Sequence, residues 1–113
     1  MQRTKTSPND IDLVIVATTT PDYHFPSTAS ILCDKLGPEQ CFLFLTCRLF
    51  AVDFCMQWRR GANFIRSGKY KKVVIVGADK MSSVIDYTDR ATCPIFGDGA
   101  AAFMLEPPGR IWE

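Results

Sequence analysis

The sequence predicts a layered α/β domain, in which helices cover a mostly parallel sheet. Two observations indicate this class. Strand-like and helix-like segments alternate along the chain, and the strand-like segments are near-continuous apolar runs, as in strands buried on both faces. The chain has 113 residues and 47% apolar content, which is enough for one packed core. We therefore expect a single domain over residues 1–113.

The first expected elements are a strand and a helix. The apolar run IDLVIVAT predicts a strand near residues 12–18, which ends at a Thr-Thr-Pro turn. The loop TTPDYHFPST then leads to a helix near 27–36. Ser27 or Thr28 is the expected N-terminal cap, and Gly37 is expected to end the helix.

The remaining elements follow the same alternation. CFLFLT predicts a second strand near 41–46, and GANFIRSG forms the last turns of a helix near 52–67, which Gly68 ends. KKVVIVGAD predicts a third strand near 72–78 that closes on a Gly-Ala-Asp turn. After a long loop, AAAFMLEP predicts a last strand near 99–106.

Composition excludes several classes of function. The net charge of +1 argues against nucleic-acid binding, and no apolar run is long enough to cross a membrane. The polar N-terminus predicts a cytoplasmic setting, where the five cysteines are expected to be reduced. Their gaps do not match zinc-ligand spacing and His24 is the single histidine, so no metal site is expected.

Four motifs together carry a resemblance to a known family. They are DLVIVATTTPDYHFPSTA, GANFIRSGKYKKVVIVGADKMSS, DYTDRAT and IFGDGAAA, in this order, across nearly the whole chain. In order and spacing they resemble β-ketoacyl-acyl-carrier-protein synthase III, the condensing enzyme that initiates fatty-acid biosynthesis. The chain corresponds to the later part of the family's N-terminal half, so the resemblance implies a partial thiolase-like N-terminal domain.

The resemblance implies a thiolase-like layered fold, a homodimer and an acyltransferase. In the family, a cysteine thiolate takes the acyl group of acetyl-coenzyme A or another acyl-coenzyme A. Malonyl on the acyl carrier protein then loses carbon dioxide and attacks the thioester. The coenzyme A thioester is a substrate, and no cofactor is expected. Histidine and asparagine from the C-terminal half stabilise the developing charge. His24 cannot be that histidine, because it lies upstream of the nucleophile position.

Several site residues carry over from the family by motif. Arg90, in YTDRAT, matches the arginine that contacts the adenine end of coenzyme A; the alternative is a solvated loop arginine. Phe25, in HFPST, matches the aromatic that reaches across the dimer to line the partner's acyl pocket. The alternative for Phe25 is a core aromatic that anchors its loop. Gly97, Asp98 and Gly99, in GDGA, are expected near the site, where glycine is required for backbone conformation.

The nucleophile motif is missing from its expected place. Between CFLF and GANF the family carries AACSGF with the nucleophilic cysteine, whereas this chain reads LTCRLFAVDFCMQWRRG over residues 45–61. Counting forward from Gly37 places the nucleophile at Phe50, and counting back from Gly61 places it at Ala51.

No thiol of this stretch is in register with the family's nucleophile. Cys47 is the nearest one, but Arg48 and Leu49 follow it where a tight turn needs small residues, and Cys55 is also displaced. We therefore assign no catalytic residue in the chain as written.

Two frameshifts would explain this stretch and the tail. One set of codons allowed for Thr46 to Gly61, when its reading frame is shifted by one base, contains GCC GCC TGT TCG, which encodes Ala-Ala-Cys-Ser. When the frame is shifted by two bases, the rest of the same codons reads GGT GGA TTT TTG TAT GCA ATG GCG ACG, which encodes Gly-Gly-Phe-Leu-Tyr-Ala-Met-Ala-Thr. The tail Pro-Gly-Arg-Ile-Trp-Glu similarly yields Glu-Gly-Tyr-Gly. Residues 47–60 and 108–113 are thus expected to be out of frame.

Other interpretations of the stretch stay open. Residues 47–60 could form a helix with Phe50, Phe54 and Trp58 on one side, either as core or as a basic-aromatic binding face. A thiol-sensing cysteine pair is conceivable, although no base is identifiable for either thiol. At the level of the whole chain, the alternative to an acyltransferase is a non-catalytic remnant that pairs with intact subunits through DYHFPST.

The frameshift hypothesis makes a prediction about the gene. The encoding DNA should contain an Ala-Ala-Cys-Ser-coding frame that overlaps residues 47–50, and an open C-terminal half in another frame beyond Glu113. Sequencing the gene checks this directly. Codons that spell the motif block in no frame would refute the hypothesis.

Overall fold

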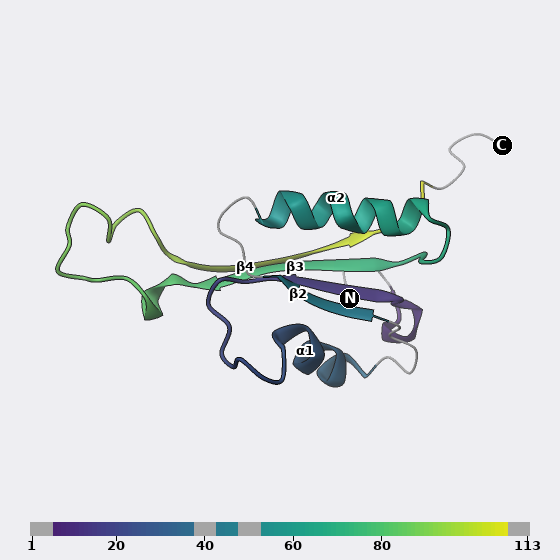
Figure 1. The fold of residues 1–113 in the computed structure, drawn as a ribbon, viewed down its shortest axis with the longest axis horizontal. Helices are drawn as coiled ribbons and strands as arrows, with labels where there is room; N and C mark the ends of the chain where they lie inside the picture. Colours follow the sequence, from purple (N-terminus) through teal and green to yellow (C-terminus); the bar gives the residue numbers. More distant parts are fainter. Residues whose placement is uncertain (1–5, 38–42, 48–52, 109–113) are drawn as a thin grey trace.

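A computed structural model describes residues 6–37, 43–47 and 53–108 of the chain. Helix α1 lies on one face of a sheet and helix α2 lies on the other (Figure 1), so the predicted layered α/β architecture is confirmed. The strand order is β2-β1-β3-β4. In chain order the elements are η1 (Pro8–Asp10), β1 (Leu13–Ala17), α1 (Thr28–Leu36), β2 (Leu43–Cys47), α2 (Asp53–Arg66), β3 (Val73–Lys80), η2 (Met81–Ser83) and β4 (Asp98–Leu105).

Strand β1 is the centre of the sheet. It pairs in parallel with β2 on one side and with β3 on the other, and all five of its residues are buried. Successive side chains of a strand point to opposite faces. Leu13 and Ile15 therefore join the core beneath α2, whereas Val14 and Val16 join the core beneath α1.

Helix α1 begins and ends as the sequence predicts. The Ser27 side chain is the N-terminal cap and accepts the amide hydrogen of Ser30 at 3.3 Å. Gly37 ends the helix in the left-handed region, with φ of 64°, where glycine has no Cβ penalty. The amide of Ala29 also donates to Thr46 Oγ1 at 3.1 Å, which ties the start of the helix to β2.

Helix α2 covers the other face through a mainly apolar side that includes Phe54, Phe64 and Ile65. Gly61 lies where the helix approaches the sheet most closely: a Cβ there would stand 2.9 Å from Ile75 Cδ1 and 3.0 Å from Leu105 Cδ1. Since real Cβ atoms do not come this close, the approach of α2 to β3 and β4 depends on glycine at this position.

The structure corrects three details of the sequence prediction. Strand β3 continues through Asp79 to Lys80, past the predicted turn, because Lys80 pairs with Asp98 of the antiparallel strand β4. Cys47 is the last residue of β2, so it is not part of the helix proposed for residues 47–60, of which the structure describes Asp53 onward as α2. The two short 3₁₀ helices were not predicted.

The aromatic side of α2 packs mainly against the sheet. The ring centroids of Phe54 and Trp58 are 6.3 Å apart, and both rings contact Phe103 of β4 at 5.2 and 5.9 Å. Phe54 belongs to the core, while Trp58 and Phe103 remain about half exposed. The core interpretation is therefore correct for Phe54.

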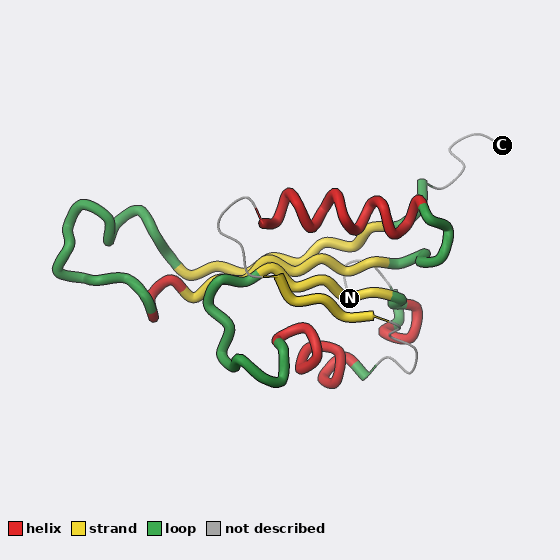
Figure 2. Tube along the Cα trace, in the orientation of Figure 1, coloured by secondary structure: helices red, strands yellow, loops and turns green. Residues whose placement is uncertain are grey.

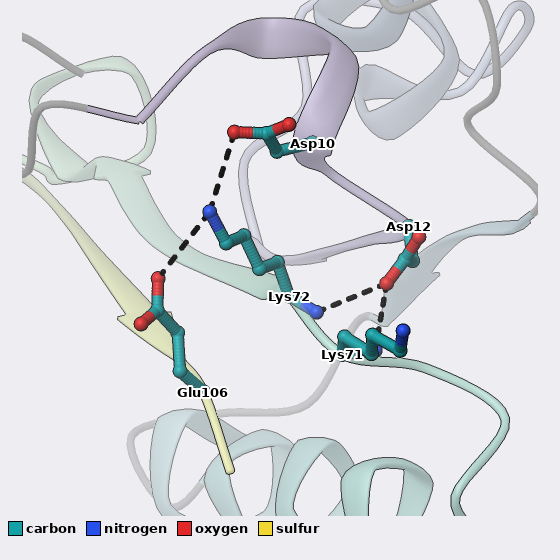
Figure 3. A network of polar contacts seen from close by, with 5 residues as sticks. All are labelled: Asp10, Asp12, Lys71, Lys72 and Glu106. Atoms are coloured by element: carbon teal, nitrogen blue, oxygen red, sulfur yellow. Dashed lines mark hydrogen bonds and ion pairs between the residues drawn. The ribbon is translucent and has the colours of Figure 1, made fainter. Parts of the chain in front are cut away.

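A charged network joins the amino ends of β1 and β3 (Figure 3). Asp12 Oδ2 accepts the amide hydrogens of Lys71 at 2.6 Å and Lys72 at 3.0 Å. The Lys72 ammonium lies 3.3 Å from the Asp10 carboxylate and 3.9 Å from that of Glu106, beyond the end of β4. This network joins the amino ends of β1 and β3 to the carboxyl end of the antiparallel strand β4.

Two absences concern only the part of the chain that the structure describes. Within it, no helix is long and apolar enough to cross a membrane. Among the same residues, no group of three or more histidine, cysteine, aspartate or glutamate side chains is arranged to hold a metal ion.

Gly61→Val should destabilise the fold by about 1–3 kcal/mol, because the added side chain must displace the buried ends of Ile75 and Leu105. Chemical denaturation of the 113-residue chain measures this. Asn63→Val is the matched control, since it places the same β-branched residue on an exposed position of the same helix. Equal losses in both variants would contradict the close-approach argument.

Candidate functional site

The candidate site lies where the three parallel strands end. The carboxyl ends of β1, β2 and β3 meet at one edge of the sheet, with Ala17 in register with Cys47 on one side and with Gly77 on the other. The long loops that follow β1 and β3 leave the sheet at this edge (Figure 2). Ligands of open α/β sheets bind at this edge, in the loops that follow the strands. A hollow here is lined by residues that follow β1 and by the ends of β3 and β4, including Thr18, Thr20, Asp22, Asp79, Asp98 and Gly99.

The loop after β1 is bonded to the end of β3. Asp79 Oδ1 accepts both the amide hydrogen and the hydroxyl hydrogen of Thr19, each at 2.7 Å. In the next position, the Lys80 amide donates to Thr20 Oγ1 at 2.6 Å. Three short hydrogen bonds therefore fix the direction in which the chain leaves β1.

The loop after β3 is closed at its base by a second carboxylate. Asp98 accepts the Ser82 amide hydrogen on Oδ1 and the Ser82 hydroxyl on Oδ2, both at 2.7 Å. Hydrogen bonds from the Ser82 hydroxyl and then from its amide hold the pKa of Asp98 below its ordinary value. Desolvation opposes this shift, and the charge of Lys80 adds a lesser lowering effect. These hydrogen bonds therefore favour the charged form of the Asp98 carboxylate.

Arg90 lies in the loop that joins η2 to β4, which projects beyond the sheet (Figure 1). Hydrogen bonds to carboxylates stabilise the turns on either side of Arg90. Asp86 accepts from the amide and the hydroxyl of Thr88. Asp89 accepts from the amide of Ala91 and the hydroxyl of Thr92. These bonds lower the pKa of both aspartates, led by the hydroxyl bond in each case.

The guanidinium of Arg90 is available to an anionic ligand. Arg90 is exposed, and within the described ranges it forms no ion pair. A solvated arginine and a ligand-binding arginine both fit this placement, so the two interpretations of Arg90 stay open.

Phe25 lies in the loop that follows β1, and its side chain points to solvent. Its side chain is 90% exposed, which excludes the alternative that it anchors the loop in the core. Tyr23 of the same loop is also largely exposed. A shallow hollow separates this loop from the start of the Arg90 loop and is lined by Thr20, His24, Lys80 and Val84, among others. The structure thus places Phe25 and Arg90 on adjacent loops at one end of the molecule.

The predicted glycine-rich turn is only partly as expected. Asp98 and Gly99 belong to β4, and Gly97 directly precedes it. Gly97 and Gly99 both have open space where a Cβ would stand and neither has a positive φ. The structure therefore shows no positive-φ requirement at these two glycines, and their expected role in tight packing near the site stays a prediction. Asp98 and Gly99 line the hollow.

The expected nucleophile position falls outside the described residues. Phe50 and Ala51 lie between the end of β2 and the start of α2 in the sequence, and Cys47 is the last residue of β2. Of the thiols whose burial the structure gives, Cys33 is buried in α1, Cys55 is exposed on α2, and Cys93 is partly buried in the Arg90 loop.

Sequence reasoning missed the hydrogen bonds that the carboxylates of Asp79 and Asp98 accept at this edge of the sheet. Thr19 and Asp79 each lie just beyond the last pair of the parallel β1–β3 register, Ala17 and Gly77. Because parallel strands end at one edge, polar residues that follow them come together there, so this signal was present in the sequence.

Comparison with known proteins gives a consistent result. A sequence model of the 3-oxoacyl-[acyl-carrier-protein (ACP)] synthase III family matches residues 53–111, more than half of the chain. The β-ketoacyl-[acyl-carrier-protein] synthase III 1 of Bacteroides thetaiotaomicron is 73% identical over 107 residues, which are 95% of this chain and 32% of that protein. A Phocaeicola vulgatus synthase III is 62% identical over 106 residues, 94% of this chain and 31% of its own.

Solved structures agree with the sequence relatives. The 3-oxoacyl-[acyl-carrier-protein] synthase III of Aquifex aeolicus superimposes with a TM-score of 0.89 at 36% identity, over 95% of this chain and 34% of that one. The priming β-ketosynthase of the R1128 polyketide pathway gives 0.88 at 30% identity, over 95% and 32%. The thiolase-like fold is therefore confirmed, and the chain spans about a third of the length of the curated relatives it matches.

The two hydrogen bonds that Ser82 donates to Asp98 predict a specific pH response. The amide proton of Ser82 should titrate with a midpoint below 3.8, the ordinary aspartate value, because the folded carboxylate is stabilised in its charged form. The contribution of the Asp98 carboxylate to folding stability is fully present above its pKa in the unfolded chain, and it is lost as the pH falls through its pKa in the folded chain. NMR of the Ser82 amide measures this, and Asp98→Ala should abolish the titration. A midpoint at or above 3.8 would contradict it.

Proposed function

The chain belongs to the 3-oxoacyl-[acyl-carrier-protein] synthase III family, and from this premise we propose that it is part of a condensing enzyme that initiates fatty-acid biosynthesis. The observation that carries the proposal is the 73% identity to a synthase III over 95% of this chain. The reaction joins the acyl group of acetyl-coenzyme A, or of another acyl-coenzyme A, to malonyl carried by the acyl carrier protein. We propose the cytoplasm as its setting.

In the proposed reaction, a cysteine thiolate attacks the thioester carbonyl and coenzyme A leaves as the thiol. Decarboxylation of malonyl releases carbon dioxide and leaves a carbanion, which attacks the acyl-enzyme and expels the cysteine. The thiolate requires a lowered pKa, which the amino end of a helix can supply. Phe50 and Ala51, the positions that correspond to the family's cysteine, immediately precede α2 in the sequence, which supports such a role for that helix.

We assign the adenine end of coenzyme A to Arg90. Its exposed guanidinium can both stack on the base and pair with phosphate. The bonds of Asp86 and Asp89 to their neighbouring threonines stabilise the turns on either side of it. These contacts support a preorganised loop that presents the arginine to the ligand.

We assign Phe25 to the acyl pocket of a homodimer. A phenylalanine that is 90% exposed in one chain is costly to leave in water, and burial against a second subunit would remove that apolar surface. Tyr23, in the same loop, would widen the contact. The same exposure would also serve the alternative function, a non-catalytic remnant that pairs with intact subunits.

We also propose that residues 47–60 and 108–113 are out of frame in this chain, which is a partial thiolase-like N-terminal domain. Gln57 supports the proposal for the first stretch. Its side chain is fully buried on the side of α2 that faces the sheet, where the shifted frame encodes alanine. Gln57 Oε1 accepts a hydrogen bond from Arg60 Nη1 at 3.4 Å, so the support comes only from a long polar side chain that interrupts the apolar side of the helix.

The 113-residue chain as written should not condense acyl groups. Loss of an essential member of a catalytic unit typically lowers the rate by a factor of about 10⁴–10⁶. The measurement is condensation of labelled acetyl-coenzyme A with malonyl-acyl-carrier protein. The positive control, termed the restored enzyme, carries the family's AACSGF block within residues 47–60. The parts of the relatives' length that this chain does not span are taken from the Bacteroides thetaiotaomicron synthase III. Activity of the unaltered chain, or none in the restored enzyme, would overturn the proposal.

In the restored enzyme, Arg90→Ala should raise KM for acetyl-coenzyme A on the order of 10-fold, since it removes a charge-assisted contact. Arg66→Ala, at the exposed end of α2, is the matched control and should leave KM unchanged. Steady-state kinetics at varied acetyl-coenzyme A measures both variants. If Arg90→Ala behaves like the control, Arg90 is only a solvated loop arginine.

A further inference from the structure

Helix α2 approaches β3 closely at two points. Gly61 provides the first, because a Cβ there would lie 2.9 Å from Ile75 Cδ1. The second lies two turns earlier in the helix, where the ring of Phe54 packs over Gly77. A Cβ on Gly77 would stand 3.2 Å from Phe54 Cδ2, closer than ordinary van der Waals contact. Phe54 and Gly61 are seven residues apart in the sequence, so they share one side of the helix.

The two contacts together define how α2 is tilted against the sheet. At the first contact the helix carries the glycine, so the backbone of α2 comes close to β3. At the second contact the sheet carries the glycine, so a large ring of the helix fits against β3. The points lie about 10 Å apart along the helix axis, which is far enough for a shift at one of them to change the tilt.

Phe54 holds the start of the helix on the sheet. Of the α2 residues that pack on this core, it is the one nearest to the amino end of the helix. Its ring also contacts that of Phe103 of β4, with the centroids 5.2 Å apart. The hollow beside the ring is lined largely by small residues of β3 and β4, among them Ala78 and Ala101. A displacement of this one ring would therefore move the first turn of α2 relative to β3.

Residue 54 is phenylalanine in both frames of the altered stretch. The chain as written has Phe54, and the frame shifted by two bases also encodes Gly-Gly-Phe at positions 52–54. When the family's AACSGF is placed with its cysteine at Ala51, its phenylalanine falls at the same position. We therefore expect the restored enzyme to keep the contact between Phe54 and Gly77.

We propose that Gly77 and Phe54 are positioning residues, which place the first turn of α2 and the thiol that precedes it. A side chain at position 77 would lift the amino end of the helix, while Gly61 keeps its second half close to the sheet. A displacement of about 1 Å at a reacting group can cost on the order of 100-fold in rate. The catalytic part of this inference rests on the proposed function, whereas the contact itself is a property of this chain.

The contact is tested on the 113-residue chain by a double-mutant cycle in chemical denaturation. Gly77→Val should lower the folding equilibrium constant, because the added methyl groups meet the Phe54 ring. In the Phe54→Leu background the same substitution should cost about 3- to 30-fold less, since the ring is absent. Gly99→Val is the matched control: this glycine of β4 has open space at its Cβ, so its effect should be equal in both backgrounds. Additive effects of Gly77→Val and Phe54→Leu would refute the contact.

The catalytic consequence is measured in the restored enzyme. The rate is expressed per thiol that acetyl-coenzyme A protects from iodoacetamide, so that loss of folded enzyme does not count. Gly77→Val should lower kcat by about 10-fold, because the thiol is displaced from groups supplied by other parts of the protein. KM for acetyl-coenzyme A should change by less than about 2-fold, since Arg90 is unaltered. The pH midpoint of alkylation should stay the same, because the thiol moves together with the helix end that lowers its pKa.

A second substitution separates positioning from a general loss of packing. Phe54→Leu should lower kcat by itself, yet raise it in the Gly77→Val variant, because the smaller side chain makes room for valine. Ala102→Val, which lies on the α1 side of the sheet, is the control and should leave kcat unchanged.

The positioning role is overturned if Gly77→Val behaves like Ala102→Val, or if Phe54→Leu fails to raise kcat in the Gly77→Val variant. It is also overturned if the whole effect of Gly77→Val appears in KM. Absence of acyl transfer in the unsubstituted restored enzyme would instead refute the proposed function, and the double-mutant cycle would then judge the contact by itself.

Discussion

Burial of β1 on both of its faces is the constraint on which the rest of the structure depends. Five consecutive apolar residues can leave water only if a strand pairs on each side and a helix covers each face. The parallel neighbours β2 and β3 and the helices α1 and α2 meet these four requirements. Because both neighbours run parallel to β1, three carboxyl ends are forced to one edge, and the candidate site is a consequence of that packing.

Apolar runs and capping residues were sufficient to predict most of the architecture. Within the described residues they located α1, α2 and the strands β1 to β4, together with the Ser27 cap and the Gly37 end of α1. They ended β3 too early, because Asp79 and Lys80 are polar and are strand residues only through pairing with β4, about 20 residues away. A pairing between distant segments leaves no periodic signal in either one.

The candidate site was less predictable than the fold. Motifs identified Arg90 and Phe25 as single residues, but the loop positions that relate them are set by Asp79 and Asp98. The short length of side chains such as threonine and serine allows them to bond to whatever carboxylate the fold brings near, so their partners depend on topology. Gly97 and Gly99 were suggested by a family motif, and neither has a positive φ, so the role expected for them stays a prediction.

The projecting loop between η2 and β4 has a consequence for the continuity of the chain. Its residues are mostly exposed and stand away from the helices (Figure 1), while β3 and β4 on either side of it pair along eight consecutive positions. Exposed loop tips are where proteases cut and where insertions are tolerated. A cut in this loop would leave two pieces still joined along a full strand pair, so the loop is a natural point at which to split the domain into complementing halves.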